Sequence, residues 1–534
     1  MIVDAHACER IGAVWLRAAL APVGDFGRRS DQVFVPFGPG DEAAARAACA
    51  HVLALAHTLA SDGVARVRAA LRRAPDAQPL FARARAGDPL TDVDLYEVGR
   101  FIDALRETSD AWFDAGGAAA DRPPTLEALG AILAPGRSGA GFYLADAFAA
   151  ELAPLRARYA DADERVQRER ARLAMTFAPQ LGFMPEGDEF IAMRDALPLV
   201  PAGMRVVRET PAYRTLALEL DATALAAAHD LECALSELAE GEASARRALA
   251  ERIGMHMSDV HAATAALGAL DRTLARVAFT QRWDGCVPHF TTEHLAFDEA
   301  TFAPLAEALA HEGLSYTRLS LDLRGVAVIT GPNMGGKSAA LATCGFLALC
   351  CAYGVPPPAQ AFEGPLFAHV AWIGAGGSND FTRLLSSFGA EVALASDALA
   401  IDERPELVLV DEFARTTGPR EGRALTIALL EALVRRGAFA LAATHFDGVA
   451  RLAHVAHVAI AGLGDRVLDV RAARNLHMAL DAVARAMDYR IVKVEAGAPA
   501  PSDALALARL LGLEEAIVER AAALFAAGDA PTGG

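Results

Sequence analysis

The chain has 534 residues, which is long enough for two to four domains with a sizeable core. Hydrophobic residues make up 53% of it, and because much of that share is alanine we expect a helix-rich protein. The net charge of -18 argues against attraction of the whole chain to nucleic acid or an anionic membrane, so such a contact needs a local basic surface.

The seven cysteines show neither paired nor zinc-like spacing, which fits a reducing cytosol. Two apolar stretches are candidates for a targeting or membrane segment, Ile11 to Leu20 and Ser338 to Ala359. Arg17 interrupts the first, so it is not a convincing signal peptide. The second begins directly after Lys337 and ends in three prolines, which favours a buried helix. We expect a cytoplasmic protein with no membrane partner.

The first two thirds of the chain read as helical. Amphipathic helices such as Glu42 to Leu71 come first, followed by a charge-rich helix from Leu144 to Met175. Its arginines alternate with acidic residues, which indicates a solvated face with i,i+4 pairs; an arm that contacts nucleic acid is the alternative. A β-containing insert at 180–220 and a second helical stretch, Asp221 to Thr280, complete a hairpin-like lever.

From Leu321 to about Gly464 short apolar strands alternate with helices, the signature of an α/β sheet. The expected strands are Val326 to Thr330, Phe367 to Trp372, Leu407 to Val410, Phe439 to Ala443 and Val455 to Ile460. The tail returns to helix over Ala504 to Phe525 and ends in a glycine-rich segment that we expect to be disordered.

The run Gly331 to Ser338, with sequence GPNMGGKS, lies between the first of these strands and a long uncharged helical segment. Such a loop turns successive backbone N–H groups toward one point, and its glycines remove the Cβ atoms that would keep phosphate oxygens away. Lys337 supplies a positive charge for the β and γ phosphates, and the Ser338 hydroxyl suits Mg²⁺. The pattern predicts an ATP-binding loop.

Asp411 and Glu412 follow a buried strand, at the edge where open α/β sheets bind ligands. We expect Asp411 to hold Mg²⁺, directly or through water, and Glu412 to polarise the water that attacks the γ-phosphate. His445 follows the strand Phe439 to Ala443 and is expected beside the same crevice, where it senses the γ-phosphate.

These motifs together resemble the MutS family of mismatch-repair ATPases, whose phosphate loop also contains Pro-Asn-Met. Three further segments follow in the order found in the family. They are a signature-loop segment with Ser386-Ser-Phe388 and Glu391, the acidic pair followed by Ala-Arg-Thr-Thr417, and the histidine segment Ala443 to Phe446. The resemblance covers about 267 to 524 and is faint before that. It implies a Mg²⁺-dependent ATPase that works as a homodimer or heterodimer with composite sites.

The resemblance also assigns roles residue by residue. It makes Glu412, His445 and Asn333 catalytic, and it has Ser338 and Asp411 hold the metal. Ser386 reaches into the nucleotide of the partner subunit. The residues expected to bind ATP are Gly331, Pro332, Asn333, Met334, Gly335, Gly336, Lys337, Ser338, Ala339 and Ser386.

The chain departs from the family pattern at three places. Leu384 and Leu385 stand where the signature loop usually carries Gly-Arg, and Ala414 and Thr416 replace glycines after the acidic pair. The only Phe-x-Glu triplet, the mark of the family's mismatch reader, begins at Phe297, too close to the ATPase region for that role. The residues before the ATPase leave room for core and lever helices but not for mismatch and connector domains as well.

The expected fold is therefore an α/β P-loop NTPase of ABC-like type, preceded by an all-α core and lever region and followed by a C-terminal helical dimerisation element. We expect a helical core at 1–130, levers with the insert at 131–266, a helical transition at 267–320, the ATPase at 321–465, and the dimerisation region with its tail at 466–534.

Two functions stay open: a DNA-repair ATPase that engages DNA through its levers without reading mismatches, and an ATP-dependent reactivating partner of an adenosylcobalamin-dependent aminomutase.

Overall fold

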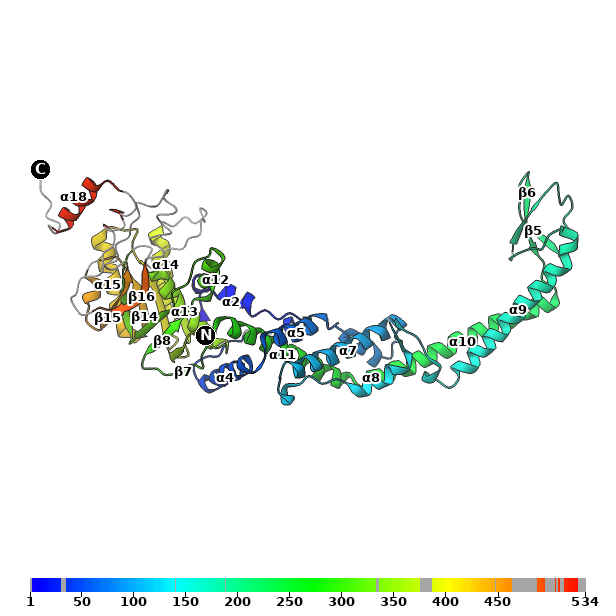
Figure 1. The fold of residues 1–534 in the computed structure, drawn as a ribbon, viewed down its shortest axis with the longest axis horizontal. Helices are drawn as coiled ribbons and strands as arrows, with labels where there is room; N and C mark the ends of the chain where they lie inside the picture. Colours follow the sequence, from blue (N-terminus) through cyan, green and yellow to red (C-terminus); the bar gives the residue numbers. More distant parts are fainter. Residues whose placement is uncertain are drawn as a thin grey trace. The chain divides into compact units, whose positions relative to one another are not determined.

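The computed structural model describes residues 2–29, 35–139, 141–187, 189–332, 336–374, 387–446, 448–462, 487–494, 505, 508–509 and 513–526. It divides into two compact units (Figure 1). Unit 1 contains residues 1–72, 110–122 and 268–534, and unit 2 contains residues 73–109 and 123–267. Each unit is described by itself below.

Unit 1 is built around a seven-stranded sheet in the order β1-β12-β13-β14-β10-β15-β16. All neighbours in it are parallel except β16, which runs antiparallel to β15. The strands are β1 (Ile2–Val3), β10 (Val326–Thr330), β12 (His369–Gly374), β13 (Glu406–Asp411), β14 (Phe439–Ala443), β15 (Val455–Gly462) and β16 (Asp488–Lys493).

Helices cover both faces of this sheet because its central strands are apolar on both sides. Along β13, Leu407 and Leu409 pack with α13 (Lys337–Ala352), whereas Val408 and Val410 pack with α15 (Pro419–Arg436) and α14 (Ser387–Ala400). The uncharged segment after Lys337 is thus the buried core helix that the sequence predicts, although it ends at Ala352 and not at Ala359.

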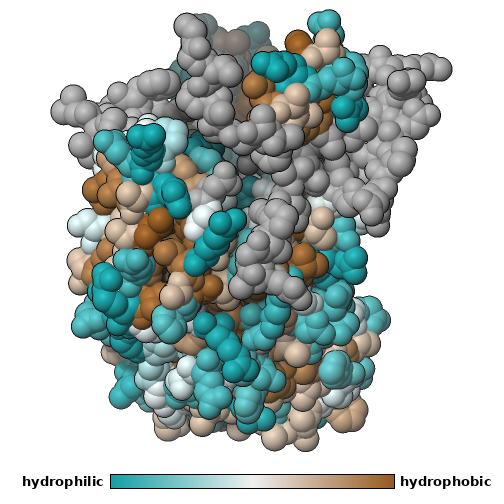
Figure 2. All heavy atoms as spheres, turned by 90° about the vertical axis from the view of Figure 1, so that its left-hand side faces the viewer, coloured by the Kyte–Doolittle hydropathy of each residue, from teal (hydrophilic) through white to brown (hydrophobic). Residues whose placement is uncertain are grey.

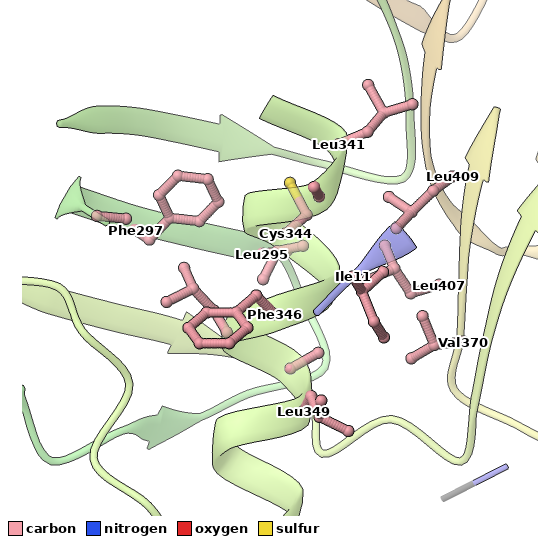
Figure 3. Close-up of a cluster of buried hydrophobic side chains, with 14 of the residues drawn as sticks. Ile11, Leu295, Phe297, Leu341, Cys344, Phe346, Leu349, Val370, Leu407 and Leu409 are labelled. Atoms are coloured by element: carbon pink, nitrogen blue, oxygen red, sulfur yellow. The ribbon is translucent and has the colours of Figure 1, made fainter. Parts of the chain in front are cut away.

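The first residues of the chain belong to this sheet. Ile2 pairs with His369 and Val3 with Val370, so β1 forms the sheet edge beside β12. Helices α1 (Ala5–Arg10) and α2 (Ala13–Ala19) follow, and fully buried Ile11 lies among Leu407, Leu409 and α13 (Figure 3). The boundaries expected from the sequence group these residues with a helical core, whereas the structure packs them against the seven-stranded sheet and α13.

The segment expected to be a helical transition, 267–320, is helical only in part. Helix α11 (Met257–Trp283) leads into it, but β7 (His289–Phe290), β8 (Leu295–Ala300) and β9 (Leu319–Leu323) then form a four-stranded sheet with β11 (Ala361–Gly364). The alternating burial of β8, with Leu295 and Phe297 inward, explains the strand. Between β8 and β9 lies α12 (Ala303–His311).

The expected helix from Glu42 to Leu71 is two helices, α4 (Glu42–Thr58) and α5 (Ser61–Arg73), bent by 109°. Ser61 and Asp62, residue types favoured at helix starts, begin the second. This bent pair has the length and composition of a membrane span, and no single helix in the described ranges has them. Unit 1 also contains α3 (Asp25–Arg28) and α18 (Glu515–Ala526).

Unit 2 contains the long antiparallel pair α9 (Leu152–Leu181) and α10 (Ala222–Gly254), which lie side by side (Figure 1). The first begins later than the expected Leu144, and Pro154, which lacks a backbone N–H, lies in its first turn, where no intrahelical donor is needed. Its end is capped by Gly182 at φ 74°. Between the two helices, β4 (Glu189–Met193), β5 (Met204–Glu209) and β6 (Tyr213–Leu218) form an antiparallel sheet in the order β4-β6-β5.

The expected stretch Asp221 to Thr280 breaks where α10 ends. A Cβ at Gly254 would lie 3.0 Å from the backbone of Arg85, closer than an ordinary Cβ contact, so glycine eases this approach to α6 (Gln78–Arg85). Helix α11 then begins at Met257. The remaining elements of unit 2 are α7 (Asp92–Asp114), which continues into unit 1, α8 (Glu127–Leu133), β2 (Arg137–Ser138) and β3 (Gly141–Phe142).

Candidate functional site

The glycine loop joins β10 to α13, as its sequence predicts. Gly331 has φ 143° and Gly336 φ 87°, values that L side chains rarely adopt. A Cβ at Gly331 would also lie 3.1 Å from Cβ of Ile460. The backbone at both ends of the loop therefore requires glycine, while Asn333, Met334 and Gly335 lie outside the described residues.

Lys337 begins α13 and folds back over the loop. Its Nζ atom donates to the carbonyl oxygens of Gly331 at 2.9 Å and Pro332 at 3.3 Å. Burial lowers the pKa of Lys337, and the nearby carboxylates of Glu412 and Asp411 counteract that shift. The amine therefore lies between the loop and the acidic strand end, where it can meet a phosphate.

Ser338 and Asp411 meet across the site. The Ser338 hydroxyl donates to Oδ1 of Asp411 at 3.0 Å, so the start of α13 is joined to the end of β13. Burial raises the pKa of Asp411, and the Ser338 hydrogen bond and the charges of Arg10 and Lys337 oppose this. A hydroxyl and a carboxylate that converge in this way are oxygen ligands of the kind that Mg²⁺ prefers, so these residues fit the metal that the sequence implies.

Glu412 leaves the strand in a left-handed conformation, with φ 52°. Its N–H donates to the carbonyl oxygen of Ala443 at 3.0 Å, which anchors the turn to the end of β14. Its carboxylate accepts a hydrogen bond from Arg415 at 2.9 Å, and about a fifth of the side chain is exposed. The strand order places β14 between β10 and β13, so all three carboxyl ends meet here.

His445 follows β14 at this same sheet edge. It is exposed, and its ring packs on that of Phe446 with 4.5 Å between centroids. The preceding Thr444 is buried, and its hydroxyl accepts the Phe446 N–H at 3.1 Å. The structure thus brings His445 to the edge that carries the loop and the acidic pair, while Ser386 lies outside the described residues.

A cavity of about 280 Å³ opens beside the loop. Gly336 and Ala339 line one side of it, and Tyr316, Met487 and Tyr489 line another. These three residues were not predicted from the sequence, because they lie near the loop only through the packing of β16 and of the segment before β9. No motif in the sequence marks them.

The N-terminal helix α1 supplies two further polar groups near the site. The positive charge of Arg10 acts on Asp411, and the His6 ring donates a hydrogen bond to the backbone of Gly374, at the end of β12. Burial lowers the pKa of His6. Because only the pairing of β1 with β12 brings α1 here, nothing in the sequence indicates these residues.

A glycine loop between strand and helix, a lysine and a serine at the helix start, and an acid at a nearby strand end define an α/β NTPase of the P-loop class. Residues 327–527 match the family model described as MutS domain V. This stretch of the chain therefore carries a MutS domain V, as its motifs predict. No mismatch-reading domain is recognised in the residues before it.

Curated relatives agree with this assignment. Endonuclease MutS2 of Anaeromyxobacter sp. is 36% identical over 210 residues, 39% of this chain and 24% of the relative. Endonuclease MutS2 of Halalkalibacterium halodurans is 29% identical over 285 residues, 52% of this chain and 33% of the relative. Endonuclease MutS2 of Gemmatimonas aurantiaca is 32% identical over 194 residues, which are 36% of this chain and 22% of the relative. The matches thus span a third or less of each relative's length.

Proposed function

We propose that this protein binds ATP with Mg²⁺ between the glycine loop and the acidic strand end, hydrolyses it, and couples the reaction to DNA as a dimer. The observation that carries the ATPase proposal is the 3.0 Å hydrogen bond between Ser338 and Asp411, with Lys337 folded over the adjoining loop. These three groups provide a hydroxyl, a carboxylate and an ammonium around one point, which suits a metal-bound triphosphate.

Each residue then has a role in hydrolysis. Lys337 and the start of α13 bind the phosphates, and Ser338 with Asp411 hold Mg²⁺, which neutralises negative charge on the phosphates. Glu412 orients the attacking water, and His445 senses the γ-phosphate from the end of β14. Asn333 contacts phosphate or water, and Ser386 reaches the site of the partner subunit.

The cavity beside the loop is proposed to receive the adenine base. It borders Ala339, one residue beyond Ser338, so a nucleotide whose phosphates lie on the loop can extend into it. The ring of Tyr489 and the side chain of Met487 offer apolar surfaces against which a base can pack. Nucleotide selectivity would then come from residues that the phosphate loop does not contain.

Two substitutions test the ATPase. Lys337→Ala should abolish ATP binding in an equilibrium titration, whereas Lys493→Ala, at the other lysine of the chain, should leave it unchanged. Glu412→Gln should keep ATP binding and lower turnover by on the order of 10² or more. Exposed Glu431→Gln is its matched control. Wild-type affinity in Lys337→Ala, or wild-type turnover in Glu412→Gln, would contradict the proposed site.

DNA is proposed as the partner because the relatives that share this domain are named endonuclease MutS2. The lever helices α9 and α10 are the elements proposed to contact it. Arginines of α9 already pair with acids of α10 or its cap: Arg158 with Glu237, Arg165 with Asp230, and Arg172 with Asp221. DNA phosphates must therefore replace these acids as the partners of the arginines, so the affinity for DNA depends on few net charges.

Salt dependence tests this partner. The affinity for a fluorescent 40-base-pair duplex and for a four-way junction is measured by anisotropy between about 25 and 200 mM KCl, with and without ATP. A phosphate-binding surface gives a log-log slope of roughly -0.9 for each neutralised phosphate. The absence of binding at the lowest salt, with or without nucleotide, would refute the DNA proposal.

A protein client is the second candidate, and the sheet between α9 and α10 favours it. Its outer face exposes Ile191 and Met193, which are 61% and 57% accessible, and Leu199 beside it is 84% accessible. Residues 182–220 contain four arginines and six acidic residues, a net charge of -2, which attracts no phosphate backbone. Stimulated ATP turnover on addition of a purified adenosylcobalamin-dependent aminomutase, but not of DNA, would select this function.

The dimer is proposed to form partly through the C-terminal helix α18. Its Ile517 and Leu524, seven residues apart, are about half exposed, as is Leu513 just before it. That spacing forms one apolar helix face that a second copy or a related subunit can cover. Light scattering should show a dimer for the full chain and a loss of mass on truncation after residue 494; an unchanged mass would place the dimer contact elsewhere. A heterodimer would form only with the second subunit added.

A further inference from the structure

A buried carboxylate on α14 contacts the turn that carries Glu412. Glu391 is 1% exposed, and its Oε2 atom accepts the backbone N–H of Ala414 at 2.7 Å. Burial raises the pKa of Glu391, and this hydrogen bond together with the charge of Arg415 acts in the opposite direction. A buried acid is unfavourable without such a partner, so its place in the fold calls for a reason.

The turn that it contacts is strained. Glu412 has φ 52° and Ala414 has φ 61°, a left-handed region that L residues rarely adopt because Cβ approaches the backbone carbonyl oxygen there. Ala414 is fully buried, and its carbonyl oxygen lies 2.7 Å from where a Cβ at Gly422 would be. The space around the turn therefore admits few other conformations. In this conformation the backbone N–H of Ala414 points at the Glu391 carboxylate, which accepts its hydrogen bond.

We propose that Glu391 is a positioning residue for ATP hydrolysis: its carboxylate holds Ala414 in the left-handed conformation and so fixes the turn that presents Glu412. The inference rests on the proposed ATPase function. Glu391 touches neither phosphate nor metal in this role and acts only through the backbone. Because Ala414 carries a Cβ, the conformation that glycine would adopt freely has to be held from outside.

The same contact joins α14 to the acidic strand end. Helix α14 begins at Ser387, directly after the segment proposed to reach the partner subunit. A shift of α14 by a fraction of an ångström would lengthen the bond between Glu391 and Ala414 and release the turn. Glu391 thereby links the position of α14 to the placement of Glu412.

A double-mutant cycle tests this role. Glu391→Ala should lower kcat on the order of tenfold to a hundredfold, as for loss of a charge-assisted hydrogen bond, while the dissociation constant for ATP stays within about threefold. Glu391→Gln, which keeps a weaker acceptor, should lie between Glu391→Ala and the wild type. Asp397→Asn, at an exposed position of the same helix, is the matched control and should be neutral.

The decisive measurement is rescue by glycine. Ala414→Gly removes the Cβ that disfavours the left-handed conformation, so the double variant Glu391→Gln/Ala414→Gly should recover most of the lost kcat. The inference is overturned if kcat is the same with glutamate, glutamine or alanine at position 391. It is also overturned if the loss of kcat in Glu391→Gln persists unchanged when residue 414 is glycine. Equal losses of kcat and ATP affinity would also overturn it. A wild-type chain that hydrolyses no ATP refutes the proposed function itself, which keeps the two failures distinct.

Discussion

Gly345 on α13 is packed against the N-terminal segment, and a methyl group there tests whether that segment belongs to the ATPase core. A Cβ at Gly345 would lie 2.4 Å from Cγ2 of Ile11 and 3.0 Å from Cδ1 of Leu409. Alanine gains about 1 kcal/mol over glycine in a helix, but such overpacking costs about 1 to 3 kcal/mol. Gly345→Ala should therefore destabilise unit 1 by up to about 2 kcal/mol.

The reciprocal change should relieve this clash. Ile11→Ala removes a fully buried side chain and should cost about 2 to 5 kcal/mol alone. In the double variant the new methyl group enters the space that Ile11 leaves, so the double variant should be more stable than Ile11→Ala by about 1 kcal/mol. Val14→Ala, at a position 69% exposed, is the control and should change stability by less than about 0.5 kcal/mol.

Scanning calorimetry of the four variants measures these differences as shifts of the unfolding temperature, about 1 to 2 °C for each kcal/mol in a unit as large as unit 1. Strictly additive effects of the two substitutions would refute the contact between Ile11 and Gly345. An unchanged unfolding temperature in Ile11→Ala would show that the first residues do not contribute to the core.

Three further predictions concern pH, nucleotide choice and DNA. The His457 ring forms a hydrogen bond with the Thr330 hydroxyl at 2.8 Å, and burial lowers the pKa of His457. The unfolded chain therefore binds the proton more readily, so the stability of the protein should fall as pH drops below about 6.5. In His457→Gln, calorimetry at pH 7.5 and 5.5 should show a smaller fall in stability. In competition titrations, Tyr489→Ala should weaken the binding of ATP about tenfold and the binding of inorganic triphosphate hardly at all. Equal losses of affinity for the two ligands would contradict the proposal that the base binds in the cavity. Glu237→Gln frees Arg158 and should steepen the salt slope of DNA affinity by about one unit, and an unchanged slope would place the DNA away from this part of the lever.

Figure 2 views the end that stands at the left of Figure 1, and brown apolar side chains are interspersed there with teal polar ones. The exposed face of α18 is part of the same unit. Its role in dimerisation stays a prediction until the truncation after residue 494 is measured.

The sequence alone determined the parts whose signal is local. The glycine loop, the strand before it, and the acidic end of β13 are encoded by glycines, apolar runs and charges within a few residues, so their order along the chain could be predicted. The strands β10 and β14 have the bounds that the sequence predicts. The resemblance to MutS domain V followed from the same short motifs.

Only the tertiary structure decided which distant residues meet at this site. The pairing of β1 with β12 brings Arg10 to Asp411 across some 400 positions, β16 brings Tyr489 beside the loop, and α14 buries Glu391 against Ala414. Such contacts depend on strand order and helix packing, which arise from apolar burial summed over many residues and leave no local pattern. The same reason explains why 267–320 looked helical, since its strands are short, and β7 and β8 find their partner in β11 more than sixty residues away.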